Sequence, residues 1–139
     1  MRTVLLSGAS GFIARQAARK LKEAGFRTIG ISRLSQPLPF FDAVFRGTLT
    51  EPLTDIFEEE IHVFIHCANH VGKDDYRINV EGTRLWAEQA EREGVKLQIY
   101  LGSVSARPDS PSSYARAKHD LEEWFKFRHQ VVLRLGLVL

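Results

Sequence analysis

Tyr114 and Lys118 are the two residues whose types and spacing most directly suggest chemistry. On a helix, a spacing of four residues puts the phenol and the ammonium on one face. A cation beside a phenol favours the phenolate, so Tyr114 could exchange a proton with a ligand near neutral pH. Ser103 lies upstream of the pair and adds a hydroxyl. These residues predict a proton-transfer site.

A glycine-rich turn near the N-terminus predicts a nucleotide site. The apolar run 4–6 is typical of a buried parallel strand and leads directly into Gly8 and Gly11. Gly8 allows a tight turn, and Gly11 leaves room for a pyrophosphate to approach the backbone. The helix expected over residues 12–24 would direct its free N–H groups and positive dipole end at that phosphate. A plain strand–turn–helix crossover without a ligand is the alternative.

Strands and helices alternate along the chain as a doubly wound parallel α/β sheet requires. Gly25 and Gly94 fall where helices should end. Residues 34–41 are too few and too proline-rich for a crossover helix, so we expect a loop there, and residues 54–60 predict only a brief helix. The strands are expected over residues 2–7, 27–32, 43–46, 61–67, 97–102 and 130–135.

Composition indicates one ordinary globular domain over residues 1–139. The chain is 44% hydrophobic and 26% charged, and its formal net charge is +2. This charge is too small to predict nucleic-acid binding, and no apolar run is long enough for a membrane span. The single cysteine, Cys67, excludes an internal disulfide and fits a reducing cytoplasm. No pattern of cysteine, histidine and acidic residues suggests a metal site.

Several motifs follow one another in an order that is itself informative. The segments are GASGFIA (8–14), HCAN (66–69), INVEGTRLWAEQA (78–90), YLGSVSA (100–106), YARAK (114–118) and VVLRLGLVL (131–139). Together they resemble the extended branch of the short-chain dehydrogenase/reductase superfamily, the NAD-dependent epimerase/dehydratase family. Ala14 stands where that family has the third glycine of its turn. The resemblance implies a Rossmann-like sheet of about six strands, with helices on both faces, that binds a nicotinamide dinucleotide.

The resemblance also implies catalytic roles. Ser103 would hydrogen-bond the substrate oxygen, with Ser105 as its nearest rival. Tyr114 would move the hydroxyl proton as hydride passes to or from the nicotinamide, and Lys118 would hold the nicotinamide ribose. Asn79 matches the asparagine at the head of the N-V-x-G-T helix and is expected to support the site.

Arg33 bears on the type of cofactor. In such folds the residues after the second strand meet the adenosine ribose, and an acidic residue there selects a free 2′-hydroxyl. A guanidinium instead suits a 2′-phosphate, so we expect NADP ahead of NAD; a solvated loop arginine is the alternative. Thr48 stands where the family has an aspartate near adenine. The expected cofactor-binding residues are Gly8, Ser10, Gly11, Phe12, Ile13, Arg33, Cys67, Ala68, Asn69, Tyr114 and Lys118.

Partners follow from the same resemblance. Family members continue past the sixth strand into a lobe that holds the substrate, so residues 1–139 are expected to be the nucleotide-binding half without that lobe. A fragment, a prematurely ended gene and a reduced protein that borrows a partner all stay open. The expected substrate is a small molecule, with nucleotide sugars among the candidates. A homodimer is expected through the helices that contain Trp86 and Trp124.

Three classes of function stay open. The favoured one is an NADP-dependent oxidoreductase or sugar-nucleotide epimerase/dehydratase. A non-catalytic dinucleotide sensor would have no use for Tyr114 and Lys118, and an interaction fragment would have no use for the glycine turn. His66 and His70 are expected to be walls of the cofactor pocket rather than metal ligands. Cys67 is expected to be a small buried hydrophobe.

Overall fold

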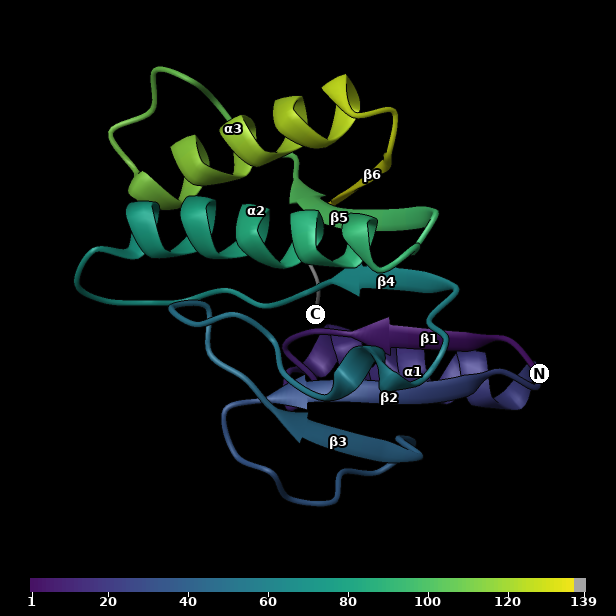
Figure 1. Cartoon of the computed structure of the whole chain (residues 1–139). Coiled ribbons are helices and arrows are strands. Elements are labelled where there is room, and N and C mark those ends of the chain that lie inside the picture. The colour runs from purple at the N-terminus through teal and green to yellow at the C-terminus, as the bar shows by residue number, and fades with distance from the viewer. Residues whose placement is uncertain (137–139) are drawn as a thin grey trace.

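The chain folds around a six-stranded parallel sheet. The computed structural model describes residues 1–136, and the strand order is β3-β2-β1-β4-β5-β6 (Figure 1). The strands are β1 (Thr3–Leu6), β2 (Arg27–Ser32), β3 (Ala43–Arg46), β4 (Val63–His66), β5 (Leu97–Ser103) and β6 (Val131–Leu135). The helices are α1 (Phe12–Glu23), α2 (Asp75–Arg92) and α3 (Ser113–Phe127), with a 3₁₀ turn, η1 (Ile56–Glu58). This order is that of a Rossmann-type sheet, so the expected doubly wound fold is confirmed.

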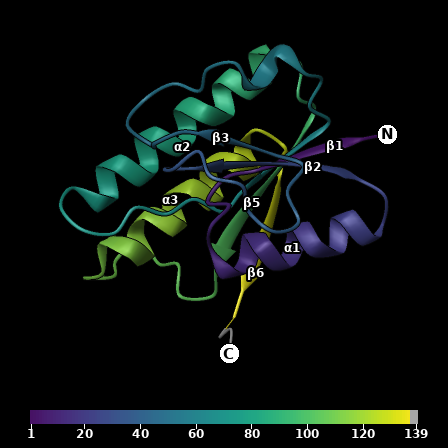
Figure 2. The ribbon, with the colours of Figure 1, turned by 90° about the horizontal axis from the view of Figure 1, so that it is seen from below.

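The two faces of the sheet carry different helices. Figure 2 shows α1 on one face and both α2 and α3 on the other. The chain moves from β1 outward to β3 and then returns to β4 on the other side of β1. Because crossovers are right-handed, this reversal puts the later helices on the opposite face and leaves a crevice at the carboxyl ends of β1 and β4. Within residues 1–136, no helix combines the length and apolar character that crossing a membrane would need.

Most predicted boundaries agree with the structure. β2 and β3 have the predicted bounds, the other strands differ by one or two residues at an end, and residues 34–41 contain no helix. The brief helix predicted over residues 54–60 is present only as the 3₁₀ turn η1, which is shorter than predicted and is not α-helical. Asp55 before it has a left-handed φ of 66° and Glu59 after it is extended, so neither can continue a helix. Residues 137–139 of the last motif lie outside the described residues.

Alternate residues of β4 face opposite sides of the sheet. Phe64 belongs to the core cluster that packs with α2, whereas Ile65 and Cys67 join the cluster on the α1 side. This alternation decides which residues after β4 face the α1 side and which lie beneath α2 and α3.

Trp86 belongs to the core rather than to an outer helix surface. It is 2% exposed, and its indole N–H donates to the Glu51 carbonyl oxygen at 2.8 Å. Gly82, one turn earlier, permits this packing, because a Cβ there would lie 2.2 Å from the Leu49 carbonyl oxygen. The glycine of the N-V-x-G-T motif therefore serves the contact between α2 and the loop after β3.

Candidate functional site

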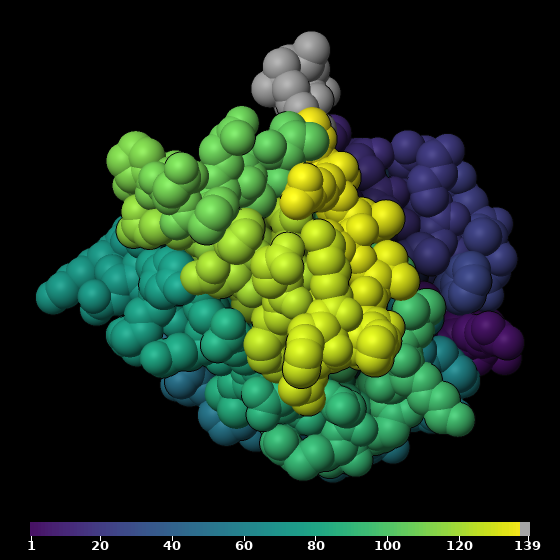
Figure 3. Space-filling view, turned by 90° about the horizontal axis from the view of Figure 1, so that it is seen from above, coloured from purple at the N-terminus to yellow at the C-terminus, as the bar shows by residue number. Residues whose placement is uncertain are grey.

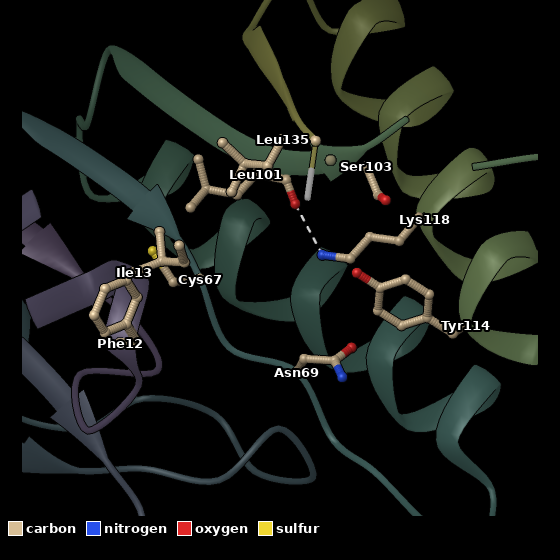
Figure 4. A pocket seen from close by; sticks show the side chains of 11 residues that line it. Phe12, Ile13, Cys67, Asn69, Leu101, Ser103, Tyr114, Lys118 and Leu135 are labelled. Carbon is tan, nitrogen blue, oxygen red and sulfur yellow. Dashed lines mark hydrogen bonds between the residues drawn. The ribbon is translucent and has the colours of Figure 1, made fainter. Parts of the chain in front are cut away.

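A cavity of about 600 Å³ lies at the carboxyl ends of β4, β5 and β6. Figure 4 shows the Tyr114 hydroxyl and the Lys118 ammonium pointing toward the same part of it, with Phe12 across from them. The lining residues are Phe12, Ile13, Cys67, Asn69, Leu101, Gly102, Ser103, Tyr114, Lys118, Leu135 and Gly136. The fold thus brings together seven of the residues predicted for the site. The other predicted residues are outside this lining: Gly8, Ser10, Gly11, Arg33, Ala68 and Asn79.

Gly8 forms the turn that follows β1. Its φ is +62°, in the left-handed region that favours glycine, and a Cβ would lie 2.8 Å from the Cys67 carbonyl oxygen and 2.9 Å from the Ala68 Cα. The Ser7 hydroxyl accepts hydrogen bonds from the backbone N–H groups of Cys67 and Ala68, both at 3.0 Å. The turns after β1 and β4 are therefore held together at the point where the order of strand addition reverses.

The N-terminus of α1 is suited to an anion. Gly11 precedes the helix, and a Cβ built on it would meet only the Gly8 carbonyl oxygen, at 3.2 Å. Ser10 is exposed beside it. No side chain in the described chain caps this end, and the first turn carries no acidic residue. The first N–H groups of α1 are thus left to a ligand or to water.

Lys118 projects from α3 toward β5. Its ammonium donates to the Leu101 carbonyl oxygen at 2.8 Å and lies 5.6 Å from the centre of the Tyr114 ring. Burial lowers the pKa of Lys118 to about 8, against the opposing influence of Cys67 and Glu122. Tyr114 is 42% exposed, so its hydroxyl is open to a ligand in the cavity.

Ser103 ends β5 at the rim of the cavity. Its backbone N–H donates to Glu122 Oε2 at 3.1 Å, and its hydroxyl lies 2.8 Å from the Ser105 hydroxyl. The Ser105 backbone N–H also donates to Ser103 Oγ at 3.1 Å. Ser105 is not among the lining residues, so the geometry favours Ser103 of the two candidates.

Asn79 organises the loop between β4 and α2 and does not line the cavity. Its Oδ1 accepts from the His70 backbone N–H at 2.7 Å. Its Nδ2 donates to the carbonyl oxygens of His70 and Asp75, both at 2.8 Å. Through these three hydrogen bonds the Asn79 side chain holds the loop that places Asn69 at the cavity.

Arg33 lies just past the end of β2 and is exposed. Within residues 1–136 its guanidinium has no hydrogen-bonding or ionic partner. Asp42, the first acidic residue after it, is engaged elsewhere: it accepts from the Thr28 backbone N–H at 2.9 Å and forms an ion pair with Lys22. These hydrogen bonds lower the pKa of Asp42.

The prediction that His66 is a wall of the cofactor pocket is wrong. Its ring is buried on the α2–α3 face, stacks on Phe64 at 3.8 Å and hydrogen-bonds Gln98 Oε1 at 2.7 Å. The alternation along β4 explains this orientation. His70 is also absent from the lining and contacts the Lys73 carbonyl oxygen. Cys67 does line the cavity, and burial raises the pKa of its thiol to about 12, so it stays uncharged.

The sequence interpretation missed several residues near the site. A signal existed for Glu122, because it falls four residues after Lys118 and therefore on the same face of α3. An acidic residue at a core-facing position is unusual enough to be noticed. The others carried no distinguishing pattern; the missed residues are Ser7, Leu101, Gly102, Glu122, Leu135 and Gly136. Within residues 1–136, no group of three or more histidine, cysteine or acidic side chains is arranged to hold a metal ion.

Known proteins resemble this chain in sequence and in fold. It is 32% identical over 129 residues to a ceramide reductase of Caulobacter vibrioides, covering 86% of this chain and 40% of that protein. The Bordetella bronchiseptica enzyme WbmH in complex with NAD+ superposes with a TM-score of 0.78 at 20% identity, over 100% of this chain and 57% of WbmH. A UDP-glucose 4-epimerase from Bifidobacterium longum, in complex with NAD+ and UDP, gives a TM-score of 0.74 at 21% identity, over 95% of this chain and 52% of that enzyme.

These similarities have a limited reach. At their low identity the structural matches establish the fold alone, and the chain spans about two fifths of the length of the ceramide reductase. The family model is more extensive, because the NAD dependent epimerase/dehydratase family matches residues 4–126. This match covers most of the chain, including the glycine turn and the Tyr114–Lys118 pair. The chain therefore belongs to the NAD-dependent epimerase/dehydratase family.

Proposed function

We propose that residues 1–139 form the dinucleotide-binding domain of an NADP-dependent enzyme of the short-chain dehydrogenase type. Such an enzyme transfers hydride between NADP(H) and a hydroxyl or carbonyl group of a small molecule. One observation carries this proposal: Tyr114 and Lys118 share a wall of a cavity that also includes the first residues of α1. The candidate proton-transfer pair and the first turn of α1, whose N-terminus has no side-chain cap, thus border one cavity.

The residues around the cavity fit a nicotinamide dinucleotide. Gly8 leaves no room for any side chain at the turn, and the uncapped N–H groups of α1 suit a pyrophosphate. Phe12 and Asn69, which both line the cavity, would contact the cofactor, and Lys118 would donate to its ribose hydroxyls. When bound, the cofactor supplies or accepts the hydride.

The proton would travel through Tyr114. Its hydroxyl would donate a proton to the substrate oxygen during carbonyl reduction, and its phenolate oxygen would accept the proton in the reverse direction. The Lys118 ammonium would stabilise the phenolate that remains. Ser103 Oγ would donate a second hydrogen bond to the same oxygen, and Asn79 would support the site by holding the loop before α2.

Arg33 supports NADP ahead of NAD. An exposed guanidinium after β2 can meet a 2′-phosphate in two parallel hydrogen bonds. An acidic side chain would favour the free 2′-hydroxyl instead, but Asp42 is already bonded to Thr28 and Lys22. NAD remains the cofactor expected if Arg33 does not contact the ribose.

The substrate is proposed only as a class. The ceramide reductase relative supports reduction of a carbonyl group as the reaction, because its 32% identity exceeds that of the structurally similar epimerases. A nucleotide sugar stays a candidate because two of those epimerases bind UDP or UDP-glucose. Residues that choose between these substrates would come largely from outside the cavity wall described above.

Homodimerisation through α2 and α3 belongs to the same proposal. Figure 3 shows α3 on the surface of the molecule with α2 beside it. Phe127 on α3 is 85% exposed, and Trp124 nearby lines a shallow surface pocket with Arg84. A cytoplasmic location is also proposed, supported by the free thiol of Cys67.

Calorimetric titration of the purified chain with NADPH and with NADH tests the proposal. Tight NADPH binding with weak NADH binding is the expected result, and binding of neither cofactor would contradict it. The same titration of Arg33→Asp tests the contact with the 2′-phosphate. Its matched control is Arg2→Asp, which changes an exposed arginine at the opposite end of the sheet and should leave both affinities unchanged.

Turnover separates the enzyme from a non-catalytic dinucleotide sensor. NADPH oxidation is followed by nicotinamide absorbance with a panel of ketones and aldehydes, lipid ketones and keto-sugars included. The enzyme proposal expects oxidation with at least one member of the panel. NADPH binding with no oxidation across the panel would favour the sensor. No contact in the site, as residues 1–136 form it, points to a sensor rather than an enzyme.

A further inference from the structure

Glu122 is a buried carboxylate that the proposed proton route does not use. Among the described residues it is the one acidic side chain in the fully buried set, with 0% exposure. It lies on α3 one turn after Lys118 and two turns after Tyr114, on the face that packs on β5. Because an unpaired buried charge is costly, its partners should be specific.

Both oxygens of Glu122 are engaged at the end of the sheet. Oε2 accepts from the Ser103 backbone N–H at 3.1 Å, and Oε1 accepts from Arg134 Nε on β6 at 2.6 Å. The carboxylate thus joins α3 to the carboxyl ends of β5 and β6. These are the elements that carry Tyr114, Ser103 and the rear of the cavity.

Gly102 makes this contact possible. A Cβ at Gly102 would lie 2.5 Å from Glu122 Oε2, so a side chain there would push the carboxylate off the strand. Gly102 itself lines the cavity. The glycine and the carboxylate therefore form a fitted pair directly behind Ser103.

Glu122 also acts on Lys118 through its charge. The titratable groups that face Lys118 are Cys67 from the turn after β4, Tyr100 from β5, and Tyr114 and Glu122 from α3. Burial lowers the pKa of Lys118 to about 8, and the negative charge of Glu122 opposes that shift. The Cys67 thiol and the Tyr100 phenol contribute no permanent negative charge near neutral pH, because burial raises the pKa of each.

We propose that Glu122 is a positioning residue for the candidate site: its carboxylate holds Ser103 against α3 and supplies the charge that keeps Lys118 an ammonium. The inference rests on the proposed function for the roles of Ser103 and Lys118. Its physical basis is a buried carboxylate that accepts from the Ser103 backbone N–H and lies one turn after Lys118 on α3, and this does not depend on which cofactor or substrate is bound.

Glu122→Gln tests the inference, with Glu123→Gln as its matched control. Glu123 is the next residue of α3 and is exposed, and among residues 1–136 it pairs only with Lys126, at 3.4 Å. Its replacement by glutamine changes the net charge by the same amount. The titration midpoint of Lys118 is measured by carbon-13 NMR of its Cε, whose signal is assigned by its absence in Lys118→Arg. This midpoint should fall below about 8 in Glu122→Gln. It should stay unchanged in Glu123→Gln.

Cofactor binding gives a second readout. NADPH affinity of Glu122→Gln should be about fivefold weaker than wild type near pH 8 and equal to it near pH 6, because one pKa unit changes the ammonium fraction up to tenfold. A purely structural role would weaken binding equally at both pH values. Identical Lys118 titrations in wild type, Glu122→Gln and Glu123→Gln would overturn the inference.

Arg134→Gln keeps the inference testable if Glu122→Gln does not fold. Arg134 is 50% exposed, so its loss should be tolerated, and it leaves the Glu122 charge without its neighbouring cation. The Lys118 midpoint should then move above about 8, the opposite direction. An unchanged midpoint would overturn the inference. Failure of wild type to bind either dinucleotide would instead count against the proposed function, because the Lys118 titration needs no cofactor.

Discussion

The two ends of the candidate site are held in different ways. At the end formed by β5 and α3, polar groups have protein partners: Lys118 bonds Leu101, and Ser103 bonds Glu122. At the end formed by the turn after β2, Arg33 is exposed and has no partner within residues 1–136. One end is ordered before any ligand arrives, whereas the other is open.

This difference matches what each end would have to do. Proton transfer needs donor and acceptor within hydrogen-bond distance, so its groups benefit from being held in place. Attraction between a guanidinium and a phosphate acts over a longer range and tolerates a mobile side chain. Substitutions at the ordered end should therefore change rate or stability, and those at the open end should change cofactor preference alone.

Tyr114→Phe tests the ordered end with the largest expected effect. Loss of the phenol hydroxyl removes the proposed proton donor, so turnover should fall about 10²–10⁴-fold. NADPH affinity should change by less than about twofold, because the ring and Lys118 remain. The measurement is NADPH oxidation with the substrate that the panel identifies, alongside calorimetry. Tyr76→Phe is the control, because the Tyr76 hydroxyl donates to Asp120 outside the cavity. Full turnover by Tyr114→Phe would exclude this proton route.

Gly8→Ala tests the turn that lies between the two ends. The left-handed φ of +62° and the contacts of 2.8–2.9 Å to the backbone of Cys67 and Ala68 should destabilise the fold. Together these costs amount to about 3–4 kcal/mol. Urea unfolding of the variant gives the value. Gly11→Val is the comparison: its Cβ meets only the Gly8 carbonyl, so it should fold yet lose dinucleotide binding. Equal stability of wild type and Gly8→Ala would show that the turn can relax.

His66 makes the stability of the ordered end depend on pH. Its Nε2 donates to Gln98, which itself donates to the Ala87 carbonyl, and burial lowers the pKa of His66 from 6.5 to about 4. The unfolded chain therefore binds a proton first as pH falls. Full stability is present above about pH 6.5, and about 3 kcal/mol is lost by about pH 4.

The measurement is the free energy of unfolding by urea across this pH range. His66→Phe should remove that part of the slope, because its ring suits the stack on Phe64 and does not titrate. His129→Gln, at an exposed histidine, should keep the slope. A wild-type stability that is flat between about pH 6.5 and 4 would contradict the burial of a neutral His66.

Local patterns were sufficient to predict most of the fold. The bounds of β2 and β3 follow from short apolar runs between polar and proline-rich segments, and the glycine turn follows from spacing alone. The helix predicted over residues 54–60 shortened to one 3₁₀ turn, because helix propensity is a weak signal where the backbone on both sides adopts other conformations. The prediction for His66 was wrong because the face that its side chain takes depends on the register of β4, which a short apolar run does not specify.

The ordered end was harder to predict than the open one. Tyr114 and Lys118 are near in sequence, so helical spacing placed them together. The bonds from Glu122 to Ser103 and Arg134 join three elements, and only the assembled sheet brings those together. The position of Arg33 was easier to predict, because it depends only on where one strand ends. Its role remains a prediction.

Arg33→Asp tests the open end, where the smallest effect is expected. The carboxylate would repel a 2′-phosphate and accept from a free 2′-hydroxyl, so the ratio of NADPH to NADH affinity should fall about tenfold or more. This corresponds to about 1.4 kcal/mol or more. Stability should be unchanged, because the side chain is exposed and unbonded in residues 1–136. Parallel calorimetric titrations give the ratio. An unchanged ratio would mean that a backbone or cavity group selects the cofactor, and a loss of stability would mean that the two ends are less different than the geometry indicates.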